Sequence, residues 1–443
     1  MHALVIALGS HGDVHPMLGI AVALRERGHR VTFVASPYFE PLARKAGFDD
    51  FVPLGTADEF RMALANPNLW HPVKGFKAVF LSGVLPSTRP TYDVIEQRYV
   101  PGETVVVAHA IALGARIAQD KLGVPTVTVQ LAPAVFRSLH QPPKLPGLYM
   151  PTWLPNGIKR GMWRLIDWAV IDRLLAPPIN AIRAELNLPP VTNILGEWWF
   201  SPQLVLGLFP DWFAAKPSDW PSQLRLTQFP LYDERDVEPI DPALEAFLGE
   251  GDPPIAFTPG SAMQFGQSFF RESAAACAIL KKRGILLSRH RGNVAESLPP
   301  GVRHFDYAPF SRILPRCAAL VHHGGIGTTS QALAAGVPQL IMPMAHDQFD
   351  NADRVARLGA GDSIKRRKYR AKAVAAKLSH LLTDKHVASA CRQIATRFVG
   401  VDALAATCDL IEQLVAKDAA RPSPSSPYPG ERAGERGKVR TTL

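Results

Sequence analysis

The segment ALVHHGGIGTTSQALAAGVPQ combines residue types that bind anions. An apolar strand leads into a glycine-rich turn that continues as a helix, so free backbone N–H groups and the positive end of the helix dipole meet at the turn. Glycine lets the backbone approach an anion closely, and a threonine hydroxyl or a histidine N–H can donate to its oxygens. The segment therefore predicts a phosphate site, with a tight turn and two core histidines as the structural alternative. The residues expected there are His322, His323, Gly324, Gly325, Gly327 and Thr328.

A carboxylate and a carboxamide follow the next expected strand, in PMAHDQFDNA. Asp347 and Gln348 lie at the carboxyl end of that strand, the edge at which open α/β sheets bind ligands. Together they accept and donate hydrogen bonds, which suits the hydroxyl groups of a sugar. The alternative is that Asp347 caps the helix that starts near Asp350. Since Gln331 of the preceding helix lies only sixteen residues earlier, beside the phosphate site, we prefer sugar binding.

The N-terminal loop GSHGDVHP places a carboxylate among histidines. The loop lacks GxGxxG, and the second strand, VTFVAS, does not end in an acid, so a dinucleotide-dependent dehydrogenase is disfavoured. Asp13, flanked by His11, Gly12 and His15, can instead take a proton from a substrate hydroxyl as a general base. Two alternatives are helix capping by Asp13 and a metal site at His11 and His15, although no third ligand is evident. His109, at the end of TVVVAH, orients Asp13, touches the substrate or fills the core.

Short β-branched runs that alternate with helical segments supply the elements that position these residues. Such continuous apolar runs predict parallel sheets covered by helices on both faces. Since the pattern occurs once in each half of the chain, we expect an α/β protein with two Rossmann-like, doubly wound domains that face each other across a cleft. The expected strands span residues 3–8, 31–35, 104–108, 126–131, 255–258, 285–288, 319–321 and 339–342.

The domain boundaries follow from shifts in composition. We expect residues 1–231 to form the first domain and residues 255–416 the second, joined by an acidic, Pro-containing linker at 232–254. The tail, 417–443, contains too few apolar residues to fold and is expected to be disordered. The cleft between the domains is then the place where Asp13 can face the phosphate site.

Residues 153–220 differ from both halves because they are rich in Trp and Pro and include a basic amphipathic stretch, 158–175. Three interpretations stay open. The segment is a lid over an apolar pocket, or its Trp side chains fill local core, or it docks on a membrane surface. The basic run 365–372 is interpreted as solvated surface.

The composition excludes several classes of protein. The chain has 443 residues, 47% hydrophobic and 20% charged, which is typical of a globular protein and not of a disordered, collagen-like or coiled-coil chain. A net charge of +10 fits an anionic small molecule or membrane surface but is too small to indicate nucleic acid. The four cysteines show no CxxC spacing, and the first residues are interpreted as a strand rather than a secretory signal, so a reduced, cytoplasmic protein is expected. The run 317–346 lacks charged residues, but Gly and Pro interrupt it, so we interpret it as buried strands and a helix rather than a membrane span.

Taken together, these motifs resemble the family 1 nucleotide-sugar glycosyltransferases of the two-domain GT-B fold, over residues 1–415. GSHGDVHP is similar to the acceptor-side loop of the sterol and glycopeptide branch, where Asp13 occupies the position of the catalytic base. HGGIGTTSQALAAGVP is similar to the donor motif, which implies diphosphate contacts from His323, Gly327 and Thr328. PMAHDQ matches the pair that binds the sugar, which implies this role for Asp347 and Gln348.

The resemblance also implies nucleoside contacts. Tyr307, in YAPFSRILP, takes the position where plant members stack a Trp on uracil, and Gln331 falls where many relatives place a ribose-binding Glu. Gly260 and Ser261, in FTPGS, resemble the first loop of the second domain that faces the donor. Within the family, GSHGDVHP, LFPDWFAAKPSDWP, FPLYD and AHDQFDNADR resemble the rhamnosyltransferases of rhamnolipid biosynthesis, which implies a dTDP-rhamnose donor and a hydroxy-fatty-acid acceptor.

The expected activity is therefore inverting, metal-independent transfer of a hexose or deoxyhexose from a UDP- or dTDP-sugar to a hydroxyl of an apolar acceptor. No cofactor or metal is expected. A nucleotide-sugar epimerase or hydrolase, or a non-catalytic binding module, is the alternative. The expected partners are the nucleotide sugar and the acceptor, with peripheral contact to the inner face of the membrane as an option and no nucleic acid.

Overall fold

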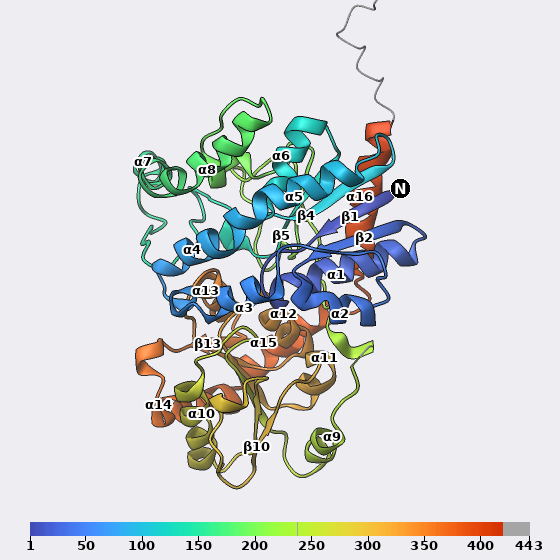
Figure 1. Cartoon of the computed structure of the whole chain (residues 1–443). Helices are drawn as coiled ribbons and strands as arrows, with labels where there is room; N and C mark the ends of the chain where they lie inside the picture. The colour runs from blue at the N-terminus through green and yellow to red at the C-terminus, as the bar shows by residue number, and fades with distance from the viewer. Residues whose placement is uncertain (237, 420–443) are drawn as a thin grey trace, which may run out of the picture.

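The computed structural model describes residues 1–236 and 238–419 and contains two α/β domains stacked one above the other (Figure 1). Each domain is built on one sheet in which every described strand pair is parallel. The prediction of two doubly wound parallel-sheet domains is therefore confirmed. The tail predicted to be disordered lies outside the described residues from position 420 onward, whereas 417–419 belong to a helix.

The N-terminal sheet has seven strands in the order β3-β2-β1-β4-β5-β6-β7. Strands β1 and β4 are fully buried along their length, as continuous apolar runs covered by helices must be. The strands are β1 (His2–Ile6), β2 (Arg30–Ala35), β3 (Phe51–Pro53), β4 (Thr104–His109), β5 (Thr126–Gln130), β6 (Leu204–Gly207) and β7 (Leu224–Leu226). The helices are α1 (His11–Glu26), α2 (Glu40–Lys45), α3 (Ala57–Ala65), α4 (Lys74–Val79), α5 (Leu85–Arg98), α6 (Leu113–Leu122), α7 (Asn156–Ile166) and α8 (Asp172–Glu185).

The C-terminal sheet has six strands in the order β10-β9-β8-β11-β12-β13. Its strands are β8 (Ile255–Thr258), β9 (Gly284–Leu287), β10 (Val302–Phe305), β11 (Ala319–His322), β12 (Gln339–Ile341) and β13 (Gly361–Ser363). The helices are α9 (Pro242–Gly249), α10 (Gln267–Leu280), α11 (Phe310–Ile313), α12 (Ile326–Ala335), α13 (Gln348–Arg357), α14 (Ala371–Thr383), α15 (Lys385–Thr396) and α16 (Ala403–Ala419). The charge-free run is thus β11, α12 and β12, as predicted.

Both sheets reverse their winding at a point that creates a crevice. In the first sheet the chain order changes between β1 and β4, and in the second between β8 and β11. Loops that leave neighbouring strands at such a point diverge to opposite faces of the sheet, so ligands bind in the space between them. The loop of Asp13 follows β1, and the glycine-rich turn follows β11. Each predicted motif therefore lies at the switch point of its own domain.

Two ends of the C-terminal domain differ from the predicted boundaries. The expected linker contains α9, whose Leu244, Phe247 and Leu248 are buried in the core of the second domain. Helix α16 returns to the N-terminal domain and packs on α1, where Cys408 and Ile411 are fully buried (Figure 1). Burial of these apolar faces explains why the second domain begins earlier than expected and why the last helix belongs with the first domain.

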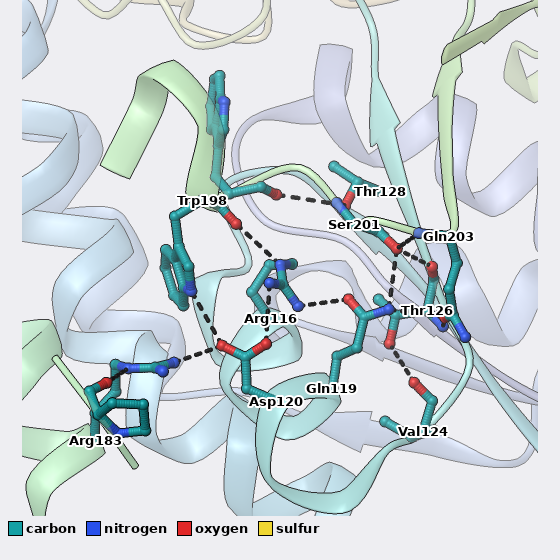
Figure 2. A network of polar contacts seen from close by, with 12 residues as sticks. Arg116, Gln119, Asp120, Val124, Thr126, Thr128, Arg183, Trp198, Ser201 and Gln203 are labelled. Carbon is teal, nitrogen blue, oxygen red and sulfur yellow. Dashed lines mark hydrogen bonds and ion pairs between the residues drawn. The ribbon is translucent and has the colours of Figure 1, made fainter. Parts of the chain in front are cut away.

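The Trp-rich segment is mostly a fixed part of the N-terminal domain and not a lid. It contributes strand β6, and Trp163, Trp198, Trp199 and Trp220 are buried. Figure 2 shows the polar contacts that fix it to α6. Asp120 of α6 accepts hydrogen bonds from Trp198 at 3.1 Å and from Arg183 at 2.6 Å, and Arg116 donates to the Trp198 carbonyl at 2.9 Å. The alternative of local core is therefore correct for these four side chains, whereas Trp153 and Trp168 are exposed.

The described residues contain no helix that is long and apolar enough to span a bilayer.

Candidate active site

The two predicted motifs meet across the boundary between the domains. The negative charge of Asp13 in the first domain contributes to the raised pKa of Asp347 in the second. The same charge acts on the ring of His346, beside Asp347. Helices α1 and α12 also pack against each other, and Ile326, the first residue of α12, contacts the core of the first domain, so the Asp13 loop and the glycine-rich turn lie on the two sides of one domain boundary. The sites at the two switch points thus form one continuous site.

Asp13 is held by the first turn of α1. Its Oδ2 accepts hydrogen bonds from the backbone N–H of Ser10 at 2.7 Å and from the Ser10 hydroxyl at 3.1 Å. Gly9 adopts φ +117°, and a side chain at that position would collide with the Asp13 carboxylate. The alternative role, stabilising the start of the helix, is therefore real. Helix capping by Asp13 uses only Oδ2, since no described hydrogen bond involves Oδ1. These bonds orient the carboxylate and leave Oδ1 without a partner among the described residues.

Three histidines near Asp13 make fixed contacts. His109, at the end of β4, donates from Nδ1 to the Leu8 carbonyl at 2.8 Å, which fixes the loop before Asp13. The ring of His15 contacts Glu234 at 3.0 Å, and that of His11 contacts Arg289 of the second domain at 3.2 Å.

Both loop histidines belong to an ionic cluster that joins the domains. Burial, with His15 and Arg289 nearby, lowers the pKa of His11 to about 3, so this ring is neutral at physiological pH. Burial alone would raise the pKa of Glu234, but the hydrogen bond from His15 and the charge of Arg289 outweigh it and lower the pKa. Gly12 is exposed at the start of α1. The cluster holds the domains together beside Asp13.

The glycine-rich turn has the geometry of an anion site. Gly324 adopts φ +95°, and a Cβ there would lie 2.7 Å from Ile341 and 3.1 Å from the backbone of Gln348. Gly325 is the N-cap residue of α12, so the first N–H groups of that helix have no partner within the helix. Gly327, in the first turn, has open space where a side chain would be, and Thr328 follows it half-buried. The turn therefore leaves room for a ligand.

The two adjacent histidines have different roles. His322 is fully buried, donates from Nε2 to Gln339 at 2.9 Å, and accepts from the N–H of Gly324 at 3.1 Å. Burial lowers its pKa to about 3. Both ring nitrogens of His322 are engaged, so this side chain shapes the turn, and of the two expected histidines His323 is the one left as a candidate for a phosphate contact.

His323 faces the site. Its ring packs against Gly260, which adopts φ +99°, and against Gly325, where a Cβ would lie 2.5 Å from Nε2. Its Nδ1 is buried and has no hydrogen-bond partner among the described residues. Burial, with His346 nearby, lowers the pKa of His323 to about 4, so its ring is neutral at physiological pH. Ser261, next to Gly260, is exposed.

The expected sugar-binding pair follows β12. Asp347 occupies the N-cap position of α13 but makes no capping bond, and its Oδ2 accepts from Asn351 at 2.7 Å. Burial raises the pKa of Asp347 to about 7; the bond from Asn351 opposes this shift and the charge of Asp13 adds to it. The Gln348 Oε1 accepts from the N–H groups of Met344 and Ala345, so this oxygen shapes the loop. Of the polar atoms of the Gln348 side chain, only the amide nitrogen is left for a ligand.

Of the expected nucleoside residues, Tyr307 follows β10 and Gln331 lies in the second turn of α12. The Arg289 guanidinium covers the Tyr307 ring at 4.5 Å, and burial raises the pKa of this phenol well above its usual range. The Gln331 side chain donates to the carbonyl of Leu231, in the segment between the domains, at 3.2 Å. Tyr307 therefore offers an aromatic surface that is already paired with a cation, and Gln331 is engaged by the backbone.

Several residues near the site could not be recognised from sequence patterns. His346 (φ +56°) donates to the carbonyl of Leu69 at 3.0 Å, and Trp70 packs edge-on against its ring. Leu69 and Trp70 lie in the segment PNLWHP of the first domain. Its two adjacent apolar residues are too few to show a helix or strand period, so the segment gave no basis for a prediction. Among the described residues, no group of three or more His, Cys, Asp or Glu side chains is placed to hold a metal ion.

Two family models and several known proteins match this chain. Residues 3–140 match the glycosyltransferase family 28 N-terminal domain, and residues 283–424 match the C-terminal domain of erythromycin biosynthesis protein CIII-like proteins. The chain is 29% identical to the O-mycaminosyltylonolide 6-deoxyallosyltransferase of Streptomyces fradiae, over 93% of this chain and 97% of that protein. It is 31% identical to the glycosyltransferase GtfE of Amycolatopsis orientalis, over 82% and 85%. The fold matches glycosyltransferase VinC, solved with dTDP, at a TM-score of 0.67 and 21% identity, over 94% and 100%.

Proposed function

The chain belongs to the family 1 glycosyltransferases of the GT-B fold, and from this premise we propose that it moves a hexose or deoxyhexose from a nucleoside-diphosphate sugar to a hydroxyl of an apolar acceptor, with inversion. The observation that carries the proposal is the packing of α1, whose first turn holds Asp13, against α12, which begins at the glycine-rich turn, across the domain boundary. A base on one side of the site and an anion cradle on the other are the two groups that a single displacement needs.

In this mechanism Asp13 removes the proton from the acceptor hydroxyl. The oxygen attacks the anomeric carbon, the bond from that carbon to the diphosphate oxygen breaks, and the electron pair leaves with the diphosphate. One displacement inverts the anomeric centre. Hydrogen bonding by Ser10 to Oδ2 fixes the carboxylate in the orientation that leaves Oδ1 for the proton. Because this geometry exists before the substrate arrives, little reorganisation is needed during the reaction.

The leaving diphosphate gains negative charge as the bond breaks. The N-terminus of α12 supplies aligned N–H groups, and His323 and Thr328 supply hydrogen-bond donors beside it. We propose that these groups offset the charge that a divalent ion would otherwise handle. The sugar hydroxyls are bound by Asp347 and the amide nitrogen of Gln348, and the nucleobase stacks at Tyr307. The dTDP bound to VinC supports a pyrimidine nucleotide, dTDP or UDP, as the donor's nucleotide.

A donor and acceptor panel tests the proposed function. Thermal stabilisation by uridine, deoxythymidine and guanosine diphosphate sugars selects the donor, and hydroxy fatty acids, sterols and phenols are then offered as acceptors. We expect a glycoside whose formation is unchanged by a metal chelator. Free sugar released regardless of acceptor, an epimerised donor, or donor binding without any turnover would each contradict glycosyl transfer. Strong inhibition by chelator that added metal reverses would contradict the metal-independent mechanism.

We also propose that the protein meets its apolar acceptor at the surface of an anionic membrane. Helix α7 exposes apolar side chains and buries a lysine, the reverse of an ordinary surface helix. Lys159 and Trp163 lie on its buried face. Ile158 and Leu165, two helical turns apart, are more than half exposed. Trp168, in the π-helical turn that follows, is 76% exposed. Large apolar side chains turned outward together, with Trp among them, are typical of interfacial helices.

The charges around this face favour an anionic partner. Arg160 and Arg164 are exposed, and neither has an ion pair within the part of the chain that the structure describes. The neighbouring acid Asp167 is turned inward and paired with Arg137. We call Trp153, Ile158, Leu165 and Trp168, with Arg160 and Arg164, the α7 face. Its combination of exposed aromatic and basic side chains matches anionic lipid.

Vesicle binding checks this proposal. Arg160→Ala with Arg164→Ala should weaken binding to phosphatidylglycerol-containing vesicles roughly 30-fold, because each basic residue near an anionic surface contributes about 1 kcal/mol. Trp153→Ser with Trp168→Ser should also weaken it. Met62→Ser with Val399→Ser, which change equally exposed apolar residues elsewhere, should have no effect. Equal vesicle binding by all variants would contradict a membrane contact. An unaltered chain that binds no vesicles but forms a dimer, with the dimer lost in the α7-face variants, would contradict it as well.

A further inference from the structure

A segment of the first domain crosses the domain boundary and contacts the donor side of the site. We call residues 66–75, which contain the 3-10 turn Pro67–Trp70, the Trp70 strap. The Leu69 carbonyl accepts a hydrogen bond from His346 Nε2 at 3.0 Å. Gly75 packs against the same two groups, and it leaves no space for a side chain: a Cβ there would lie 3.2 Å from the His346 ring and 2.8 Å from the Leu69 oxygen. The strap is therefore fitted closely to the loop that carries Asp347.

The indole of Trp70 lies between the two histidines that border the donor site. Its ring stands edge-to-face against His323, with centroids 6.4 Å apart, and against His346, at 5.9 Å. It also packs on the hydrophobic core of the second domain. His323 lies beside the glycine-rich turn, and His346 precedes Asp347. A side chain of the acceptor domain thus reaches the place where the diphosphate and sugar subsites of the other domain adjoin.

Two polar atoms at this place lack partners. Trp70 Nε1 and His323 Nδ1 are both buried and unpaired within the described residues. Buried N–H groups in native proteins are nearly always satisfied, so neighbouring exceptions need an explanation. Trp163, Trp199 and Trp220 of the first domain also have an unpaired Nε1. Trp199 lies in the core of that domain, packed on Phe200. Trp70 differs because its unpaired neighbour is the histidine that faces the expected diphosphate.

We propose that Trp70 is a donor-binding residue contributed by the acceptor domain: its Nε1–H donates to an oxygen of the sugar-diphosphate part of the nucleotide sugar. This inference rests on the proposed function and adds a residue from outside the donor domain to it. The hydrogen bond between Leu69 and His346 holds the indole in place, so the donor subsite is complete only when the two domains are docked. Donor binding and closure of the cleft are then coupled, which keeps water from the anomeric carbon.

Calorimetric titration of Trp70→Phe tests the role of the indole N–H. Phe keeps an aromatic ring of similar shape, so the packing on the histidines is largely preserved. We expect affinity for dTDP-glucose or UDP-glucose, whichever the unaltered chain binds, to fall about tenfold, the effect of losing one hydrogen bond to a charged group. Affinity for dTMP or UMP, which lack the second phosphate and the sugar, should not change. Trp199→Phe, the matched control, should behave as the unaltered chain with every ligand.

The outcomes separate this inference from the proposed function. If the unaltered chain binds neither nucleotide sugars nor nucleotides, the proposed function fails and the role of Trp70 fails with it. If the unaltered chain binds a nucleotide sugar and Trp70→Phe binds it equally well, only the role of Trp70 is wrong. Tighter binding by Trp70→Phe would also overturn the inference, because the indole would then occupy the donor's place. An equal loss for the monophosphates would show a general structural defect and would likewise contradict a specific contact.

Discussion

Asp13→Asn is expected to lower kcat by about 10²- to 10⁴-fold, the range that a positioned general base contributes, with little change in the KM for the donor. Asparagine has the same shape as aspartate, and its amide oxygen can still accept the hydrogen bonds that Ser10 donates. The start of α1 should therefore keep its structure. What is lost is the ability to take a proton from the acceptor hydroxyl, which affects the chemical step and not donor binding. Steady-state rates of glycoside formation measure the effect.

Glu59→Gln provides a matched control for the helix-capping role. Glu59 of α3 stands in the same relation to Thr56 as Asp13 does to Ser10, accepting from the Thr56 N–H at 2.8 Å. The substitution therefore repeats the loss of a capping charge away from the reacting groups, and kcat should stay close to that of the unaltered enzyme. If Asp13→Asn kept full turnover, another group would have to be the base. If both variants lost turnover equally, the effect of Asp13 would be one of helix stability.

The strands of both sheets could be predicted where they are buried on both faces. In β1, β4, β8 and β11 a continuous apolar run is the direct result of parallel pairing under helices, so the pattern and the structure express the same requirement. Strands β3 and β13, FVP and GDS, lie at sheet edges and are half exposed. Three residues with mixed polarity carry no periodic signal, and only pairing with an existing neighbour makes them strands.

The adjacent histidines show where prediction of the site ends. Successive residues at the end of a strand point to opposite sides, so His322 and His323 cannot both face one ligand. The sequence does not say which of them does, because that depends on Gln339, a partner seventeen residues away that binds His322. Trp70 was missed for a similar reason: its contacts with His323 and His346 join residues more than 250 positions apart in the chain. Only the docking of the two domains brings them together.

The first turn of α12 offers the most direct way to disturb the anion site without disturbing the fold. Gly327 is the second residue of the helix, and no atom of its surroundings lies within 4 Å of the position that a Cβ would take. An acidic residue near a helix N-terminus stabilises the helix, so Gly327→Asp should fold normally. Gly157, the second residue of α7, has the same helical position and the same open surroundings, which makes Gly157→Asp a matched control.

Calorimetric titration of the unaltered chain, Gly327→Asp and Gly157→Asp with dTDP and UDP tests the central claim. We predict that the unaltered chain and Gly157→Asp bind one of these nucleotides with equal affinity and that Gly327→Asp binds it at least about 100-fold more weakly. The reason is that like charges about 4 Å apart repel by about 4 kcal/mol at an effective dielectric constant of about 20. Undiminished binding by Gly327→Asp, or no binding of either nucleotide by the unaltered chain, would contradict a diphosphate site at the start of α12.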